Sequence, residues 1–318
     1  MRKPLKITLL TIGVIVALPV LLLTTTSIVN VVATKSDLAA ITPYGELIPV
    51  DGKQMNVVDT GVGTGNSGDT IVLLPGLGTT APALDFQPLI SELDDIHRVI
   101  AIEPFGTGLS DQTDTPRTAA NIAREVHEAL QHLGVDRYVL MGHSIAGIYA
   151  LEYSATYADE LIAFVGIDSS VPDQPGSAEP VPTDGLVELR NLGILRALAA
   201  ISGDAYAGMP YDDHTKEQMA LLTTKNSTAP TLLDEMNQAP ANFASVSGAT
   251  FPTTLPVLLF VVKDDTEVEG WVELHERQAA SVDRGQLIRL EGEHYLHHTH
   301  SPEIARDTTA FLDSLSVR

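Results

Sequence analysis

Tyr138-Val139-Leu140-Met141-Gly142-His143-Ser144-Ile145-Ala146-Gly147 places a serine between a short apolar run and a helical segment. A serine hydroxyl becomes an effective nucleophile when a base takes its proton and a sharp strand-to-helix turn presents its oxygen. Such a turn strains the serine backbone and requires small residues nearby, so that strand and helix approach closely. Gly142 meets that need, and Ala146 adds only a methyl group. We interpret Ser144 as a candidate nucleophile; the alternative is an ordinary helix N-cap serine.

Apolar runs of strand length recur along the chain, with helical segments between them. Residues 118–133 show helical spacing, whereas residues 45–50 and 54–59 predict a hairpin closed by Asp51-Gly52. The expected buried strands are residues 71–74, 98–102, 138–141, 161–167, 256–262 and 286–290. Short apolar strands alternating with helices predict an α/β fold, with a mostly parallel sheet covered by helices on both faces.

A long interval between Asp168 and Pro256 interrupts this alternation. It begins with a Pro- and Gly-rich stretch and contains helix-like segments at residues 186–200, 214–224 and 229–238. Structureless connections of this length are rare in compact folds, so we predict a helical cap or lid over residues 170–250. The core would then consist of residues 45–169 and 251–318. A partly disordered loop is the alternative.

The N-terminus has the composition of a membrane segment. Arg2, Lys3 and Lys6 precede 27 positions, residues 7–33, that carry no charge. A helix of that length reaches roughly 40 Å, more than the ~30 Å hydrocarbon layer, and a basic N-terminal flank indicates a cytoplasmic N-terminus. We predict a single-pass transmembrane anchor over residues 1–33, a linker over 34–44 and an extracytoplasmic catalytic domain. Secretion after signal cleavage near Ala33 is the alternative.

Composition excludes several classes of function. The chain has no cysteine, which excludes disulfide scaffolds, thiol nucleophiles and Cys-based zinc sites. Its net charge of −22 is unsuited to binding nucleic-acid phosphates. Residues 63–68 spell G-x-G-x-x-G, but a strand-like run follows instead of a helix, so we expect a hairpin loop and no dinucleotide site.

The chain resembles the α/β-hydrolase superfamily, in its serine esterase and lipase-like branch, from about Gly45 to the C-terminus. Leu73-Leu74-Pro75-Gly76-Leu77-Gly78 is similar to the family's oxyanion loop, with Pro75 in place of the usual His. Residues 103–111 resemble its D-x-x-G-x-G-x-S loop, with Glu for Asp at the first position. Residues 292–297 resemble its G-x-H-x-x-H ending.

The resemblance implies a catalytic set in the order serine, acid, histidine. His294 is the expected base, because a neutral imidazole can accept the serine proton and later return it to the leaving group. Asp265 is the expected acid, with Asp264 as the second choice, since both follow a buried strand. Asp168 is a weaker candidate, and its alternative is a turn or cap residue. The backbone N–H groups of Leu77 and Ile145 are expected to bind the oxyanion.

The three further histidines near the C-terminus raise the question of a metal site. His297, His298 and His300 follow the expected base within six residues. The chain contains no H-E-x-x-H pattern, and a His-rich loop needs further ligands to complete a zinc site. We therefore expect neither a metal nor an organic cofactor.

These features predict a membrane-anchored, extracytoplasmic serine hydrolase that cleaves neutral or apolar carboxylic esters through an acyl-enzyme. Haloalkane dehalogenase and epoxide hydrolase relatives use Asp at the position of Ser144, so their chemistry is not expected. Three alternatives stay open: a cofactor-free haloperoxidase-like relative, a non-catalytic cell-envelope binding protein, and a proline-type aminopeptidase. The aminopeptidase would bind a substrate amine through acidic residues of the cap, for which the candidates are Glu188, Asp204, Asp212, Asp213 and Glu217.

Overall fold

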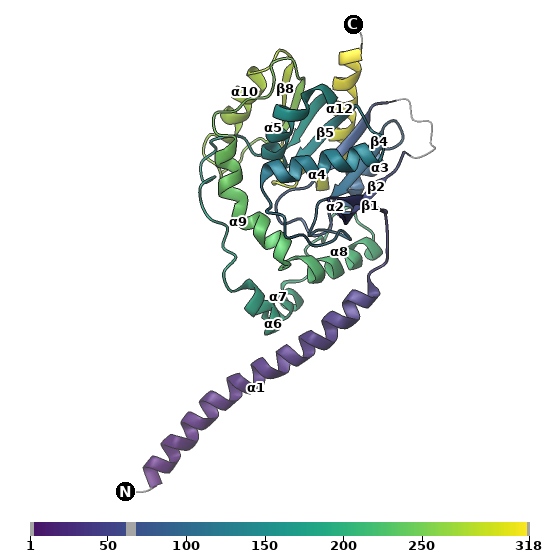
Figure 1. The fold of residues 1–318 in the computed structure, drawn as a ribbon. Coiled ribbons are helices and arrows are strands. Elements are labelled where there is room, and N and C mark those ends of the chain that lie inside the picture. Colours follow the sequence, from purple (N-terminus) through teal and green to yellow (C-terminus); the bar gives the residue numbers. More distant parts are fainter. Residues whose placement is uncertain (1–2, 62–67, 317–318) are drawn as a thin grey trace. The chain divides into compact units, whose positions relative to one another are not determined.

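The computed structural model describes residues 3–61 and 68–316, so most of the loop expected at 63–68 lies outside the described residues. The chain forms two compact units. The N-terminal unit comprises residues 1–41 and 183–207, and the core unit comprises residues 42–182 and 208–318. Figure 1 shows the ribbon coloured along the chain.

The core unit is built on an eight-stranded sheet with the order β1-β2-β4-β3-β5-β6-β7-β8. β1 and β2 are antiparallel, β2 is antiparallel to β4, and all other neighbours are parallel. The strands are β1 (Glu46–Val50), β2 (Lys53–Asp59), β3 (Thr70–Leu74), β4 (Arg98–Glu103), β5 (Tyr138–His143), β6 (Leu161–Ile167), β7 (Val257–Val262) and β8 (Gly285–Leu290). Each predicted strand is present within one or two residues of its expected bounds.

Both faces of the sheet are covered, as the continuous apolar strands predicted. Successive residues of a strand point to opposite faces, and in β3 the side chains of Ile71 and Leu73 join one core cluster whereas Val72 and Leu74 join the other. The helices of the core are α2 (Pro82–Asp85), α3 (Gln87–Leu93), α4 (Ala119–His132), α5 (Ala146–Tyr157), α10 (Trp271–Ala280), α11 (Leu296–Thr299) and α12 (Ser301–Ser316). Residues of α4 and α5 belong to the cluster of Val72 and Leu74, and residues of α3 and α12 belong to the cluster of Ile71 and Leu73.

The connection from β6 to β7 contains four helices: α6 (Leu186–Asn191), α7 (Ile194–Ser202), α8 (Asp213–Asn226) and α9 (Pro230–Ser245). The connection is divided between the units, because residues 183–207 group with the N-terminus whereas α8 and α9 group with the core. Asn226 joins α8 to the core: its buried amide donates to the carbonyls of Thr80 and Gly108. Figure 1 shows α8 and α9 in green.

The N-terminal unit contains the helix α1 (Lys3–Ala40), which continues through Pro19. Its described part from Ala17 to Ala40 is long and apolar enough to cross a membrane, by length and composition. Only 6% of an apolar 18-residue window within it is buried. A membrane anchor and a signal sequence both fit this helix.

Candidate active site

Ser144 occupies the turn between β5 and α5. Its backbone has φ +54°, a conformation that non-glycine residues rarely adopt. The turn is held from both sides, because the Ser144 N–H donates to Ile167 O (3.3 Å) and the Ser144 carbonyl accepts from Ser170 N (2.7 Å). Both partners belong to β6 or the loop after it, so the neighbouring strand maintains the strained backbone that presents the hydroxyl.

The close approach of strand and helix at this turn depends on Gly142. A Cβ at this position would lie 2.7 Å from the Cβ of Ala146, which is closer than real Cβ atoms approach. Ala146 itself is fully buried at the start of α5. The turn therefore tolerates the methyl group of Ala146 because residue 142 has no side chain.

His294 is paired with Asp168 at the end of β6. Its Nδ1 lies 2.6 Å from Asp168 Oδ2, and since a carboxylate only accepts hydrogen bonds, Nδ1–H is the donor. The other carboxylate oxygen of Asp168 accepts from the Trp271 indole (2.7 Å) and from Val262 N (2.9 Å). The Asp168 carboxylate is 0% exposed, so it is enclosed by β7, α10 and residues 291–300, which we call the histidine loop. This pairing leaves Nε2 of His294 as the ring nitrogen that can exchange a proton.

The structure pairs His294 with Asp168 and not with the acid that we expected from the sequence. Asp265 does not pair with His294; its Oδ1 accepts from the N–H groups of Glu267 and Val268 and so closes its own turn. Asp264 is exposed. The sequence signal for Asp168 was its place directly after the apolar strand β6, next to the strand that carries Ser144. Nothing in the sequence indicated that Trp271, the single tryptophan of the chain, would bind Asp168.

The expected oxyanion loop lies against the serine. A Cβ built on Gly76 would lie 3.1 Å from the Ser144 Cβ and 2.7 Å from Nδ1 of His143. Among the residues that the structure describes, no hydrogen-bond acceptor is found for the N–H groups of Leu77 and Ile145. Two free donors beside a candidate nucleophile have the character of an oxyanion site.

His143 links the serine turn to the histidine loop. Its Nε2 lies 3.1 Å from the carbonyl oxygen of His294, and the two rings are 4.6 Å apart. Burial lowers the pKa of His143 well below its ordinary value, and the nearby His297 and His294 add to this effect. The neutral ring of His143 therefore donates its Nε2–H to the carbonyl oxygen of His294. This hydrogen bond holds the histidine loop beside Ser144.

Asp85, His297 and His298 form a buried cluster behind this loop. The imidazole Nε2 atoms donate to the two oxygens of Asp85 at 2.7 and 2.9 Å. The three side chains offer ligand atoms within 4.8 Å of one another, which is close enough to hold a metal ion. Both carboxylate oxygens of Asp85 accept hydrogen bonds from imidazole, so the cluster ties the histidine loop to α2. His300 turns away and contacts Glu303 and the carbonyl of Glu291.

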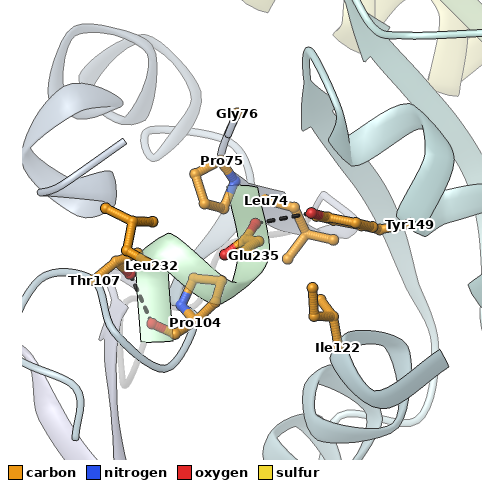
Figure 2. A pocket seen from close by; sticks show the side chains of 9 residues that line it. All are labelled: Leu74, Pro75, Gly76, Pro104, Thr107, Ile122, Tyr149, Leu232 and Glu235. Atoms are coloured by element: carbon orange, nitrogen blue, oxygen red, sulfur yellow. Dashed lines mark hydrogen bonds between the residues drawn. The ribbon is translucent and has the colours of Figure 1, made fainter. Parts of the chain in front are cut away.

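A small cavity separates the oxyanion loop from α9 (Figure 2). Its volume of ≈ 10 Å³ gives room for about one water molecule, which is too little for a substrate. Glu235 of α9 and Tyr149 of α5 meet at its wall through a 2.8 Å hydrogen bond. Burial raises the pKa of Glu235, although Arg117 opposes the shift. In contrast, all five acidic residues considered for amine binding are exposed: Glu188, Asp204, Asp212, Asp213 and Glu217.

Sequence comparison identifies the family. The profile of the Alpha/beta hydrolase family matches residues 71–307, and the chain therefore belongs to this family. The uncharacterised protein YbdG of Bacillus subtilis (strain 168) is 24% identical over 281 residues, 84% of this chain and 85% of that protein. A putative non-heme haloperoxidase of Mycobacterium phage D29 is 27% identical over 164 residues, 51% of this chain and 58% of that protein.

Solved structures with the same fold have diverse names. Cfl2 from Burkholderia cenocepacia superposes with a TM-score of 0.65 at 17% identity, covering 85% of this chain and 100% of that one. A thermophilic esterase from Thermogutta terrifontis gives a TM-score of 0.63 at 20% identity, covering 85% and 99%. The epoxide hydrolase CorEH gives 0.62 at 18% identity, covering 86% and 99%. At these identities the likeness concerns the fold.

Proposed function

We propose that the protein is a serine hydrolase that cleaves carboxylic esters, with Ser144 as nucleophile, His294 as base and Asp168 as the acid. The hydrogen bond between Asp168 and Nδ1 of His294 carries this proposal. It holds the imidazole in the tautomer whose Nε2 can accept the serine proton. The strained backbone at Ser144 supports the proposal, because it is the conformation that exposes a nucleophilic hydroxyl.

The reaction would proceed in two balanced steps. Ser144 Oγ adds to the ester carbonyl while its proton passes to Nε2 of His294, and the oxyanion binds the N–H groups of Leu77 and Ile145. His294 then returns the proton to the departing alkoxide, which leaves as an alcohol, and the acyl group stays on Ser144. In the second step water attacks the acyl-enzyme in the same way, and the carboxylic acid and the free serine are released. Asp168 stabilises the imidazolium in both steps.

An ester is favoured over an aminoacyl substrate because the acidic residues considered for amine binding are exposed. The chain's net charge of −22 favours neutral esters over anionic ones. We propose α8 and α9 as the part of the lid that covers the site, since Asn226 and Glu235 bind core residues beside the oxyanion loop.

The test combines covalent labelling with turnover. Ser144→Ala is expected to abolish labelling by a fluorophosphonate and to lower kcat for p-nitrophenyl esters on the order of 10⁶-fold. Ser91→Ala, which changes an exposed serine of α3, is the matched control and is expected to keep both. Equal activity in Ser144→Ala would exclude the mechanism. Turnover of aminoacyl-nitroanilides but not esters would identify an aminopeptidase, and the absence of labelling in the unaltered protein would favour a binding protein.

We also propose that α1 anchors the enzyme in the membrane, with the core unit on the extracytoplasmic side. The support is the uncharged run of residues 7–33 and its basic N-terminal flank. The protein is expected to stay with the membrane after alkaline carbonate extraction, whereas a chain starting at residue 42 is expected in the supernatant. Loss of the full chain to the supernatant would contradict anchoring.

A further inference from the structure

One side of α1 carries polar residues that bind the segment Leu186–Ser202, which we call the α6–α7 hairpin. Thr26 Oγ1 donates to Leu192 O (2.7 Å), Ser27 Oγ to Asn191 O (2.8 Å) and Asn30 Nδ2 to Arg190 O (2.8 Å). These carbonyls belong to the last residues of α6 and its C-cap. Carbonyls at the C-terminus of a helix can accept hydrogen bonds from groups outside the helix. Side chains of α1 therefore cap a helix that lies 160 residues away in the sequence.

The only charge of α7 is also bound to α1. Arg196 forms an ion pair with Asp37 (2.8 Å) and donates to Asn30 Oδ1 and Thr34 Oγ1, both at 3.0 Å. Gly193 permits this contact, because a Cβ at that position would meet the carbonyl of Thr26. The guanidinium is thus neutralised and hydrogen-bonded inside the unit, which lowers the cost of placing it in a medium poorer in water.

Part of the remaining surface of this unit, on α7 and on α1, is apolar. Leu198 and Ile201 of α7 are 50% and 81% exposed, and with Ile194 and Ala197 they share one helix face at positions i, i+3, i+4 and i+7. Between the polar positions of α1, four large apolar side chains are also exposed: Ile28, Val29, Val31 and Val32. Exposed apolar residues that gather on one small unit indicate a partner that is itself apolar.

The length of α1 favours the bilayer as that partner. A helix of 38 residues extends about 57 Å, whereas the hydrocarbon layer needs only about 20 residues. If the span ends near Leu23, the contacts with the α6–α7 hairpin begin at Thr26, about 5 Å further along the helix axis. No charged residue of α1 intervenes between Lys6 and Lys35. If α1 anchors the protein as proposed, the region from Thr26 onward would lie at the boundary between hydrocarbon and water.

We propose that the α6–α7 hairpin lies in the extracytoplasmic interface of the bilayer, held there by α1, with Leu198 and Ile201 inserted among the lipids. The inference rests on the proposed anchoring by α1 and extends it to a segment of the β6–β7 connection. The ligand is a lipid bilayer, bound through buried apolar surface at its interface.

The absence of cysteine allows a direct test on the full chain. Ile201→Cys, Leu21→Cys and Glu276→Cys are each labelled with an environment-sensitive fluorophore and reconstituted in phosphatidylcholine–phosphatidylglycerol vesicles. A lipid that carries a quencher near its headgroup is then added to the composition. We expect blue-shifted, quenched emission at positions 201 and 21. At position 276, which is exposed on the surface of the core unit, we expect unquenched emission.

The pattern of quenching distinguishes the hairpin proposal from the anchoring by α1. Quenching at 21 but not at 201 overturns the hairpin proposal and leaves the anchor intact, whereas no quenching at either position overturns both. Emission at 201 that is blue-shifted but unquenched indicates contact with a second chain and also overturns the proposal. Adding Asn30→Leu removes the contacts to Arg190 and Arg196 and is expected to abolish quenching at 201 only; Val29→Leu is the matched control. Quenching that persists in Asn30→Leu contradicts the role of α1.

Discussion

The carboxylate of Asp168 is held by donors from three separate elements. Val262 belongs to β7, Trp271 begins α10, and His294 lies on the loop after β8. A buried carboxylate needs such donors, because an ion without partners in the interior costs several kcal/mol. Its orientation towards His294 is therefore fixed before any substrate binds.

At the residue scale, Asp168→Asn is expected to lower kcat for p-nitrophenyl esters by about 10⁴-fold, because an amide favours the wrong imidazole tautomer. The matched control is Asp265→Asn, which alters only the turn at Glu267 and Val268 and is expected to keep kcat. Steady-state kinetics of both variants decide the assignment. A large loss in Asp265→Asn with full activity in Asp168→Asn would reverse it.

At the element scale, the junction of β5 with α5 depends on two small residues. The strand and the helix approach so closely at Gly142 and Ala146 that only one of the two positions has room for a methyl group. The same junction positions Ser144 and its backbone donor Ile145. Packing of these elements and geometry of the site are therefore coupled.

Gly142→Ala is expected to destabilise the fold by about 1–3 kcal/mol, because the added methyl overpacks the junction. The double variant Gly142→Ala/Ala146→Gly is expected to recover part of this loss, although glycine near a helix start costs up to about 1 kcal/mol. Denaturant unfolding of both single variants and the double variant measures the coupling. Additive effects in the double variant would contradict a direct contact.

A second element-scale prediction concerns the contact of α9 with α5. Burial raises the folded-state pKa of Glu235 above its ordinary value of 4.5. The protonated Glu235 carboxyl therefore makes its full contribution to the free energy of unfolding below pH 4.5. This contribution is lost as the pH rises through the raised pKa. Glu235→Gln keeps a hydrogen-bond acceptor for Tyr149 but no charge. The Tm of Glu235→Gln minus that of the unaltered protein is expected to increase from about pH 4 to about pH 8. A difference in Tm that does not change with pH would exclude ionisation of Glu235 in this range.

At the scale of the whole molecule, the charge of −22 produces a long-range field that no single contact explains. The Debye length falls from about 30 Å at 0.01 M salt to about 8 Å at 0.15 M, so the field acts on an approaching substrate only at low salt. The effect belongs to the encounter rate and leaves the chemical step unchanged.

The kcat/KM for an anionic ester, the succinate half-ester of p-nitrophenol, is therefore expected to rise with salt across this range. That of p-nitrophenyl butyrate, which is neutral, serves as the control and is expected to stay constant. Rate measurements at matched substrate concentrations test the difference. A parallel change for both esters would point to a salt effect on the enzyme itself.

The chain order of strands and helices could be predicted because it depends on local patterns. Apolar runs indicated β3 to β8, and Asp51-Gly52 marked the β1–β2 hairpin, where both residues have positive φ. The acid of the candidate site could not be chosen in this way. Asp168 and Asp265 both follow buried strands at the same edge of the sheet, and local sequence does not say which carboxylate reaches residue 294.

The sequence by itself determined the alternation of strands and helices, the strained serine turn and the apolar N-terminal helix, because each depends on residues close together in the chain. Tertiary structure alone decided the partner of His294 and the assignment of the α6–α7 hairpin to the N-terminal unit. Both depend on contacts across more than a hundred residues, Asp168 with His294 and Asn30 with Arg196. Such contacts arise from packing, which places distant side chains together irrespective of their spacing in the chain.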